Sequence, residues 1–420
     1  MLSHYVLAPP PRTLCALSET RSAVRIAHVS DFYLPRLGGI ETHVAELAQL
    51  QRSLGHEVHV VTSTPGAVSR GVHRVTNTLP RPRALHPLAV REGLRTLREL
   101  DVDVVHAHLG VASPLAFFLA RDSARRGSAT TVTVHSMWAG VAPIMAAMDA
   151  LGGWSSLPIV WSAVSRAAAD TVRCHLPPDR PIRILSNGID QDRWRSPAPA
   201  EPSGELVLAS VMRLARRKRP LALLRIVDRA QQALDRLGDP TRLRLLVAGD
   251  GPRLTAMETH LQRAATATRT GTAPNVTLLG RLERDEVHRL LATAHVFLAP
   301  ADLESFGIAA LEARCAGVPV VAKSSGGVRE FVRHEREGLL CGSDEEMVDA
   351  IVRLAREPGL RRRIAEHNRT SDCLVTWSRV LRATETAYES AAALQQTTGA
   401  GAGRRALERP AAATSQGAGR

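Results

Sequence analysis

Short apolar runs rich in β-branched residues alternate along this chain with stretches of helical periodicity. In the first half, the runs that predict strands are residues 24–29, 58–61, 102–105, 131–134, 159–165 and 182–185. A helix is predicted over residues 41–54, and Gly55 can end it. Because strands that alternate with helices form parallel α/β units, this half predicts a doubly wound sheet.

A proline-rich segment then interrupts the alternation. Residues 196–204 read Ser-Pro-Ala-Pro-Ala-Glu-Pro-Ser-Gly, a composition typical of a linker. Beyond it the alternation restarts, with strands predicted at residues 206–211, 243–248, 276–279, 296–299 and 318–322. Open α/β sheets bind ligands beyond the carboxyl ends of their strands, so two such sheets that face each other form a cleft.

The pattern divides the chain into five segments. Residues 1–22 lack a basic start and contain three consecutive prolines, so we expect a disordered leader rather than a signal peptide. Two Rossmann-like domains are expected at 23–198 and 199–376, followed by a helix at 377–395 that packs back towards the first domain. Residues 396–420 are rich in Gly, Ala, Thr and Arg, and we expect a disordered tail there.

The charge balance raises the question of a polyanionic partner. The 420-residue chain carries a formal net charge of +13, which a nucleic-acid or anionic-surface binding protein would share. Nearly all of its basic residues are arginines, however, and the only lysines are Lys218 and Lys323. The charge is therefore better explained by arginine use throughout the chain. With aromatic residues at 3%, no stacking platform for a single strand is evident, and we expect no nucleic-acid partner.

Cysteine usage and hydropathy indicate the compartment. The five cysteines are widely spaced and form no Cys-x-x-Cys pair, which indicates reduced thiols, a cytoplasmic location and no zinc site. Prolines and glycines break the most apolar stretch, residues 136–165, so no membrane-spanning helix is predicted. That charge-poor stretch on a basic chain still leaves peripheral contact with the inner face of the plasma membrane open.

The motif Glu-Ser-Phe-Gly-Ile-Ala-Ala-Leu-Glu, residues 304–312, carries the strongest chemical signal. It follows a strand, and a helix is expected to begin near Ser305. The free N–H groups of such a helix start favour an anion such as a diphosphate. Glu304 stands where a carboxylate reaches sugar hydroxyls, and Glu312, about two turns on, suits a ribose diol. The alternative is a capping acid followed by an ordinary surface glutamate.

Two further segments carry matching chemistry. Arg213 and Lys218 follow the first strand of the second half, where two cations can neutralise a diphosphate leaving group. A solvated basic loop is the alternative. Gly38 and Gly39 lie between the first strand and its helix, where they allow close approach of backbone to a ligand. They do not form the Gly-x-Gly-x-x-Gly dinucleotide fingerprint.

Together these segments resemble the retaining GT-B glycosyltransferases of the glycogen-synthase-like and mannosyltransferase-like group, which is the glycosyltransferase family 4 type. The resemblance extends over residues 24–341 and rests on the motifs GGIETHVAELA, GHEVHVVT, DVVHAH, VHS, SNGID, MRLARRKRP, AGDGP, LLGRL and ESFGIAALEARCAGVPVVAKSSGGVREFV. The opening DFYLPRLGGIE is also similar to that of lipid-linked sugar transferases, including the catalytic subunit that starts glycolipid anchors.

The resemblance implies a role for each matching position. The catalytic positions would be His135, Glu304, Arg213 and Lys218. The donor-binding positions would be Gly38, Gly39, Arg281, Ser305, Phe306, Gly307, Ile308 and Glu312. In this scheme His135 faces the sugar, and Arg281 frames the base. Gly326 and Gly327 would lie near the donor with Glu330 supporting their loop, whereas His106 and His108 either line the acceptor side or pack.

The implied activity is that of a retaining, metal-independent hexosyltransferase in glycan biosynthesis. It would take a sugar from a UDP- or GDP-sugar, bound by the second domain, and pass it to a lipid, glycan or small-molecule acceptor at the first. No cofactor is expected, because the nucleotide sugar is a substrate. A nucleotide-sugar 2-epimerase, which also uses two facing Rossmann-like halves, remains an alternative, as does a protein that binds anionic surfaces.

Overall fold

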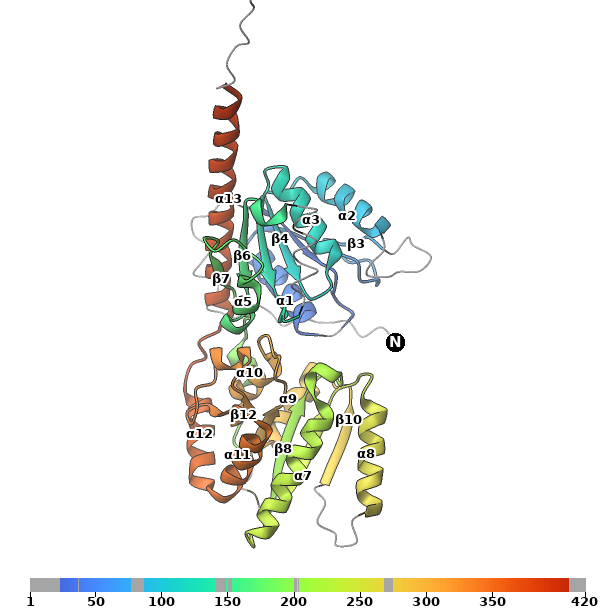
Figure 1. The fold of residues 1–420 in the computed structure, drawn as a ribbon, viewed down its shortest axis with the longest axis vertical. Helices are drawn as coiled ribbons and strands as arrows, with labels where there is room; N and C mark the ends of the chain where they lie inside the picture. Colours follow the sequence, from blue (N-terminus) through green and yellow to red (C-terminus); the bar gives the residue numbers. More distant parts are fainter. Residues whose placement is uncertain are drawn as a thin grey trace, which may run out of the picture.

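The computed structural model shows two α/β domains stacked along the long axis of the molecule, as Figure 1 shows. It describes residues 23–36, 38–76, 87–140, 153–199, 204–267 and 275–407, together with Asp149 and Pro202. The predicted leader and parts of the predicted linker and apolar stretch lie outside the described residues, as do residues 408–420. The fold class expected from the alternating pattern is therefore confirmed by two parallel sheets.

The first sheet has seven parallel strands in the order β3-β2-β1-β4-β5-β6-β7. Its strands are β1 (Arg25–Ser30), β2 (Glu57–Thr62), β3 (Val72–Arg74), β4 (Val104–Leu109), β5 (Ala129–Val134), β6 (Ile159–Ala163) and β7 (Ile182–Ile184). The central strands are buried along their whole length, as expected for a parallel sheet covered on both faces. The strand order places β1, β4 and β5 side by side, which later brings distant histidines together.

The second sheet has six strands in the order β10-β9-β8-β11-β12-β13. Its strands are β8 (Glu205–Val211), β9 (Arg242–Ala248), β10 (Asn275–Gly280), β11 (Val296–Ala299), β12 (Val320–Lys323) and β13 (Gly338–Cys341). The carboxyl ends of β8 and β11 lie at the switch point of this strand order, because β8 leads outward to β9 and β11 to β12. That is the position where doubly wound sheets bind ligands.

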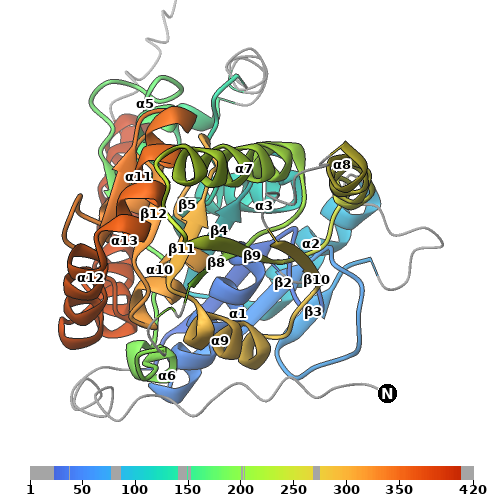
Figure 2. The ribbon, with the colours of Figure 1, turned by 90° about the horizontal axis from the view of Figure 1, so that it is seen from below.

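Helices cover both faces of each sheet. The α-helices are α1 (Gly39–Ser53), α2 (Pro87–Leu100), α3 (Pro114–Arg125), α5 (Arg166–Arg173), α6 (Gln191–Trp194), α7 (Pro220–Arg236), α8 (Leu254–Ala267), α9 (Arg284–Thr293), α10 (Ile308–Cys315), α11 (Asp344–Arg356), α12 (Pro358–Thr370) and α13 (Trp377–Leu407). Short 3-10 turns are η2 (Trp154–Ser156), η3 (Arg216–Lys218) and η4 (Gly327–Glu330). In Figure 2, α7 and α11 lie on one face of the second sheet and α9 and α10 on the other.

The last helix belongs in space to the first domain. α13 packs against β5 and β6, and its residues Ala387, Tyr388 and Ala391 are buried in a cluster with side chains of α1 and β2. Figure 1 shows it alongside the upper domain. The helix ends at Leu407, beyond the end at residue 395 that the sequence predicts.

Two short strands were not predicted. β3 has three half-buried residues, Val-His-Arg, and β13 is the four-residue run Gly-Leu-Leu-Cys after a charged turn. Neither is long enough to show a period. The helix start expected near Ser305 is also misplaced, because α10 begins at Ile308 with Gly307 as its N-cap residue.

Candidate functional site

A cleft of about 650 Å³ separates the two domains at the carboxyl ends of β8 and β11. It is lined by all of the residues that sequence reasoning singled out as catalytic or donor-binding. They are Gly38, Gly39, His135, Arg213, Lys218, Arg281, Glu304, Ser305, Phe306, Gly307, Ile308 and Glu312. The structure thus brings these positions together from both domains; their individual roles stay predictions.

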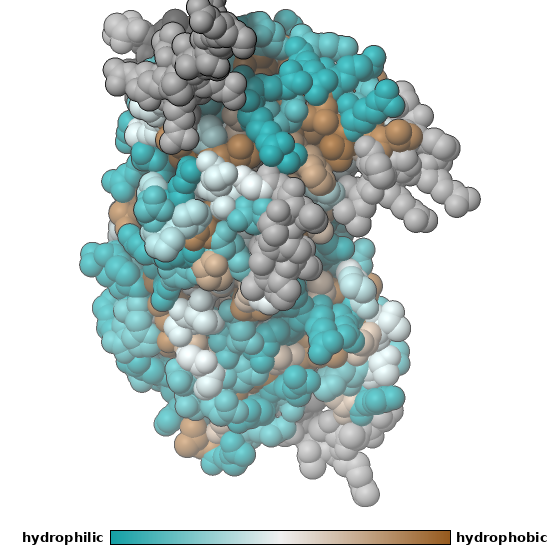
Figure 3. Space-filling model, turned by 45° about the horizontal axis from the view of Figure 1, so that its top comes forward, coloured by the Kyte–Doolittle hydropathy of each residue, from teal (hydrophilic) through white to brown (hydrophobic). Residues whose placement is uncertain are grey.

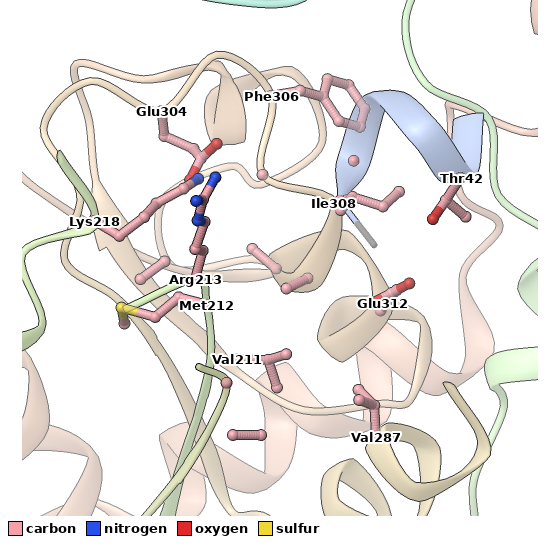
Figure 4. A pocket seen from close by; sticks show the side chains of 18 of the residues that line it. Thr42, Val211, Met212, Arg213, Lys218, Val287, Glu304, Phe306, Ile308 and Glu312 are labelled. Atoms are coloured by element: carbon pink, nitrogen blue, oxygen red, sulfur yellow. The ribbon is translucent and has the colours of Figure 1, made fainter. Parts of the chain in front are cut away.

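The ion pair between Lys218 and Glu304 is the central contact of the cleft. The Lys218 Nζ atom lies 2.5 Å from Oε2 of Glu304, and both side chains are partly buried. Lys218 ends the 3-10 turn η3 just after β8, whereas Glu304 lies on the loop after β11, so neighbouring strands bring the pair together. Figure 4 shows Arg213 with its guanidinium beside this pair. A diphosphate in the cleft would meet two cations here.

A second network fixes the turn that carries Lys218. Arg219 has a φ of 57° at the start of α7, and its guanidinium donates two hydrogen bonds of 2.8 Å to the Asp344 carboxylate. It also donates to the Pro300 carbonyl at 3.0 Å, which ties η3 to the Glu304 loop. The buried Lys323 pairs with Asp344 at 2.7 Å. Hydrogen bonds from Arg219, followed by those from Lys323, lower the pKa of Asp344 to about 2. Both lysines of the chain, Lys218 and Lys323, therefore lie in or next to this network.

Close backbone packing shapes the loop before α10. The Gly307 N-cap has a φ of 94°, in the left-handed region that favours glycine. Gly327 N donates to the Glu304 carbonyl at 2.8 Å, and a Cβ at Gly327 would overlap the Ser305 carbonyl oxygen. The Phe306 side chain turns into the core against Phe331, so only its backbone is available to a ligand. The first-turn N–H groups of α10 have no partner within the helix and suit an anion in the cleft.

Glu312 lines the cleft from α10. Burial raises its pKa to about 7, against the opposing effect of the positive charges of Arg284 and Arg193. Arg284 forms an ion pair with Glu46 of α1, so it connects the two domains beside Glu312. A carboxylate held in this environment gains from hydroxyl donors, because they stabilise its charged form.

The first domain supplies the opposite wall. A Cβ at Gly39 would lie 3.8 Å from Cγ2 of Ile308, so the α1 start faces the α10 start across the cleft. The buried Glu41 carboxylate accepts from Arg36 Nε at 2.9 Å. His135 follows β5 and is 5% exposed in the cleft wall. This wall is the one that the resemblance assigns to the acceptor side.

Sequence reasoning missed several polar cleft residues, among them Asn187, Arg36 and Arg284. Asn187 is 6% exposed, and its side-chain oxygen has no hydrogen bond among the described residues. Arg36 and Arg284 add positive charge from either side. Asn187 lies in the quoted motif Ser-Asn-Gly-Ile-Asp, and its place after a strand was a usable signal; the two arginines carry no distinguishing signal in so arginine-rich a chain.

Other expected positions have different settings. Arg281 lines the cleft with a side chain that is 54% exposed. Glu330 accepts hydrogen bonds from the backbone and side chain of Arg166, so it joins the glycine loop to the first domain. His106 and His108 are each 1% exposed and do not line the described cleft; of the two alternatives, packing is therefore confirmed.

Family models match both parts of the chain. Residues 37–193 match the model described as Glycosyltransferase Family 4, and residues 191–371 match Glycosyl transferases group 1. The two matches meet at the α6 helix, between the two sheets. Their division of the chain agrees with the two domains seen in the structure.

Curated relatives span most of the chain. A phosphatidylinositol N-acetylglucosaminyltransferase subunit of Arabidopsis thaliana is 28% identical over 385 residues, covering 88% of this chain and 82% of the relative. A GDP-mannose-dependent alpha-(1-6)-phosphatidylinositol monomannoside mannosyltransferase of Mycobacterium tuberculosis is also 28% identical, covering 79% of this chain and 89% of the relative.

Solved structures share the architecture. The Anabaena protein HepE in complex with UDP-glucose matches with a TM-score of 0.65 at 18% identity, covering 87% of this chain and 99% of the other. The catalytic domain of starch synthase IV from Arabidopsis thaliana, bound to ADP and acarbose, matches with a TM-score of 0.64 at 14% identity, covering 89% of this chain and all of the other. These likenesses show the two-domain GT-B fold.

Proposed function

Because the chain belongs to the glycosyltransferases of the group 1 and family 4 type, which use nucleotide sugars, we propose that it transfers a hexose from a UDP- or GDP-sugar with retention of anomeric configuration and without a metal ion. The observation that carries this proposal is the Lys218–Glu304 pair beside Arg213 and the α10 start, in a cleft between two domains. The pair combines a cation for the leaving group with a carboxylate for the sugar.

The chemistry follows from where charge develops. When the glycosidic bond to the diphosphate breaks, negative charge grows on the leaving oxygens. Arg213, Lys218 and the first-turn N–H groups of α10 stabilise that charge more strongly in the transition state than in the ground state. As the diphosphate binds, it competes with Glu304 for Lys218, which releases the carboxylate to accept hydrogen bonds from sugar hydroxyls.

The proposal that the anomeric configuration is retained by attack from the leaving-group face is supported by the small number of carboxylates assigned to the sugar. A double displacement needs an enzyme nucleophile and an acid/base carboxylate about 5 Å apart. Of the carboxylates that line the described cleft, we assign only Glu304 to the sugar, because Glu312 is assigned to the ribose. Attack from the leaving-group face needs no enzyme nucleophile. Product NMR of the new linkage tests this: an inverted anomer would reject the proposal.

Metal independence is a separate part of the proposal. The charge of the diphosphate is met by arginine and lysine side chains. The acidic pair Asp101 and Asp103, which has the spacing of a metal motif, is bound to Arg25 at the amino end of the sheet, away from the cleft. Activity should be unchanged by a chelator such as EDTA; loss of activity that Mg²⁺ or Mn²⁺ restores would contradict it.

Binding measurements can identify the base and the sugar of the donor. A thermal-shift panel of UDP-, GDP- and ADP-sugars would rank them, because a ligand that binds the folded state raises its melting temperature. GDP-mannose and UDP-N-acetylglucosamine head the panel, since the names of the curated relatives point to mannose and N-acetylglucosamine transfer. No shift with any nucleotide sugar would overturn the assignment.

The acceptor is proposed to be lipid-linked. Both relatives named above act on phosphatidylinositol-based acceptors according to their names, and this chain carries a formal net charge of +13. No helix in the described part of the chain is long and apolar enough to cross a membrane. The face in Figure 3 is largely hydrophilic with small hydrophobic areas, and two exposed hydrophobic side chains, Val111 and Phe118, lie just before and within α3.

Attachment would therefore be peripheral, at the cytoplasmic face of an anionic membrane. Co-sedimentation with vesicles that contain or lack anionic phospholipid tests this at low and high salt. We expect pelleting with anionic vesicles that salt reverses. A chain that stays in the supernatant at low salt would favour a glycan or small-molecule acceptor instead.

A nucleotide-sugar 2-epimerase remains the competing enzyme class. Incubation of the donor without acceptor separates the two, because an epimerase needs no acceptor. We expect the sugar to keep its configuration at carbon 2 in that incubation; an epimerised nucleotide sugar would favour the alternative.

A further inference from the structure

A set of buried polar side chains crosses the interior of the first domain behind the cleft. Hydrogen bonds join His135, in the cleft wall, to side chains from β1, α1, β4, β5, β6 and α13. These are His28, Gln51, His106, His108, Thr133, Ser162 and Tyr388. All of them are 7% exposed or less. Of this set only His135 lines the described cleft, so any effect of the others on a ligand would pass through it.

The direction of these hydrogen bonds is fixed at one end by a backbone carbonyl. Ser162 Oγ lies 2.9 Å from the Val132 oxygen, which only accepts, so Ser162 donates its single proton there. Thr133 Oγ1, 2.7 Å from Ser162 Oγ, therefore donates to Ser162. The Thr133 oxygen is left to accept from His106 Nε2, which is 2.7 Å away.

The same reasoning continues through the last helix. Burial lowers the pKa of His106 well below its usual value, so the ring is neutral and its Nδ1 is unprotonated. That nitrogen accepts from the Tyr388 hydroxyl at 2.9 Å. The hydroxyl oxygen in turn accepts from the Gln51 amide nitrogen at 3.2 Å, which directs the amide oxygen of Gln51 to His28.

Three histidines then extend this order of donors and acceptors to the cleft. His28 donates from Nε2 to Gln51 at 2.6 Å, so its Nδ1 accepts from His108 Nε2 at 2.9 Å. His108 Nδ1 accepts from His135 Nε2 at 3.0 Å. Burial lowers the pKa of His28 to about 4 and that of His135 to about 3, which keeps these rings neutral. His135 Nδ1 is thereby left unprotonated, and it has no hydrogen bond to any other described residue.

We propose that this hydrogen-bond chain sets the tautomer of His135, so that the cleft presents an acceptor nitrogen and the bound substrate must offer it a hydroxyl proton. His28, Gln51 and His108 are then positioning residues that act through His135. The identity of the ligand as a sugar rests on the proposed function, whereas the tautomer does not. A sugar with fluorine or a methoxy group in place of that hydroxyl cannot donate and should bind more weakly.

A metal ion is the other use for such a cluster. One ring nitrogen from each of His28, His106 and His108 lies within 4.8 Å of the others. However, every ring nitrogen of these three residues already takes part in a hydrogen bond of 2.6–3.0 Å, which an ion would have to displace. The distance of 2.9 Å between His28 and His108 is that of a hydrogen bond. The geometry therefore favours the proton-ordered chain.

Nitrogen NMR of the full chain labelled with ¹⁵N-histidine tests the tautomer directly. The signals of His135 are identified by their loss in His135→Asn. In the parent protein we expect a protonated Nε2 and an unprotonated Nδ1. Gln51→Met removes the acceptor of His28 and so breaks the chain between the Val132 carbonyl and His135, and it should place a proton on His135 Nδ1 in part of the molecules. Gln51→Glu keeps an acceptor oxygen and should restore the parent spectrum.

The matched control is Thr131→Val, which alters a buried hydroxyl of β5 that lies outside the chain of hydrogen bonds. It should leave the His135 signals unchanged. In sugar transfer, Gln51→Met should lose about three- to tenfold in kcat/KM, the loss expected for one hydrogen bond, and Gln51→Glu about twofold or less.

Three results would overturn the proposal. They are a protonated His135 Nδ1 in the parent protein, a His135 tautomer that Gln51→Met leaves unchanged, and one equivalent of Co²⁺ bound in a manner abolished by His108→Gln. The NMR measurement needs no substrate, so it is decided independently of the donor. If the tautomer is as expected but no nucleotide sugar binds, the proposed function fails and the hydrogen-bond chain stands.

Discussion

At the scale of single residues, charged side chains of the cleft such as Lys218 and Glu304 are paired with each other, and a ligand that binds them must replace these partners. Lys218 is paired with Glu304 in the structure, so a diphosphate bound as proposed would replace one anionic partner of the lysine with another. The cost of stripping water from the ammonium group is thus partly met before the donor arrives. This favours Lys218 as the most sensitive position of the site.

We predict that Lys218→Ala loses at least about tenfold in kcat/KM for sugar transfer. A lost charged hydrogen bond costs about 1.5–3 kcal/mol, and about 1.4 kcal/mol corresponds to a factor of ten. Arg217→Ala is the matched control, because Arg217 is an exposed cation in the same turn. Steady-state kinetics would compare the two variants. Equal kinetics for a folded Lys218→Ala and the parent would remove Lys218 from the diphosphate site.

Glu312 predicts a pH dependence. Its pKa in the folded chain is about 7, above the usual 4.5, because burial penalises the charged form. As pH rises from about 4.5 to 7, the unfolded chain gives up this proton first, so the folded state loses stability. The loss approaches at most about 3 kcal/mol above pH 7, at about 1.4 kcal/mol per pKa unit.

Glu312→Gln should remove the loss of folding stability that Glu312 causes as the pH rises. Without nucleotide, the variant should unfold at higher temperature than the parent at pH 8 and at the same temperature near pH 4.5. It should also bind the donor more weakly, because a neutral amide accepts weaker hydrogen bonds than a carboxylate. Calorimetry at both pH values makes the comparison. A variant less stable than the parent at pH 8 would contradict the raised pKa.

At the scale of secondary structure elements, periodicity predicted most of what the chain forms. The long parallel strands and the start of α13 at Trp377 follow from apolar runs and their spacing. β3 and β13 were missed because three or four residues show no period. The end of α13 was misplaced because low-complexity sequence carries little apolar pattern, although Gly, Ala and Thr still form helix to Leu407.

Site residues that lie in one local sequence motif could be predicted from the sequence. Contacts that depend on which strands are neighbours in the sheet could not. Glu304 and Glu312 share one motif, and Lys218 stands out because the chain has so few lysines. The hydrogen bond between His28 and His108 depends instead on β1 lying beside β4, a neighbour relation that a single sequence does not display. Likewise, no local signal places Tyr388 against His106.

The loop before α10 predicts a steric effect. In Gly327→Ala, the new Cβ would overlap the Ser305 carbonyl and lie 2.8 Å from Cα of Phe306, so the loop that carries Glu304 must shift. We expect a loss of about 1–3 kcal/mol in stability, as for other overpacked sites, and weaker donor binding. Gly359→Ala is the control, because nothing lies within 4 Å of its Cβ position. Urea unfolding of both variants would check this; unchanged stability of Gly327→Ala would show that the loop is not closely packed.

At the scale of the whole molecule, a few contacts hold the two domains together around the cleft. Ser165 Oγ donates to the Ser305 carbonyl at 2.5 Å, and Arg166 N donates to Glu330 at 2.7 Å. One hydrophobic cluster also includes buried residues of both domains. Because the proposed donor would contact residues of both domains, we expect its binding to favour a conformation in which the domains lie closer together.

We predict that small-angle scattering gives a smaller radius of gyration with donor than without it. Glu330→Ala removes the acceptor of Arg166 and should enlarge the ligand-free value further. Arg356→Ala, which alters a surface ion pair within the second domain, should not. Identical radii with and without saturating donor would indicate a permanently closed cleft.

The return of α13 to the first domain also has a consequence for biosynthesis. The cluster that Ala387, Tyr388 and Ala391 complete holds strands that are synthesised before the second domain. The second domain must be synthesised between them. At about 5–20 residues per second, the nascent first domain waits on the order of 10–40 s for its last helix. During that time its β5 and β6 surface is uncovered, which makes the half-made chain a natural client for a ribosome-associated chaperone.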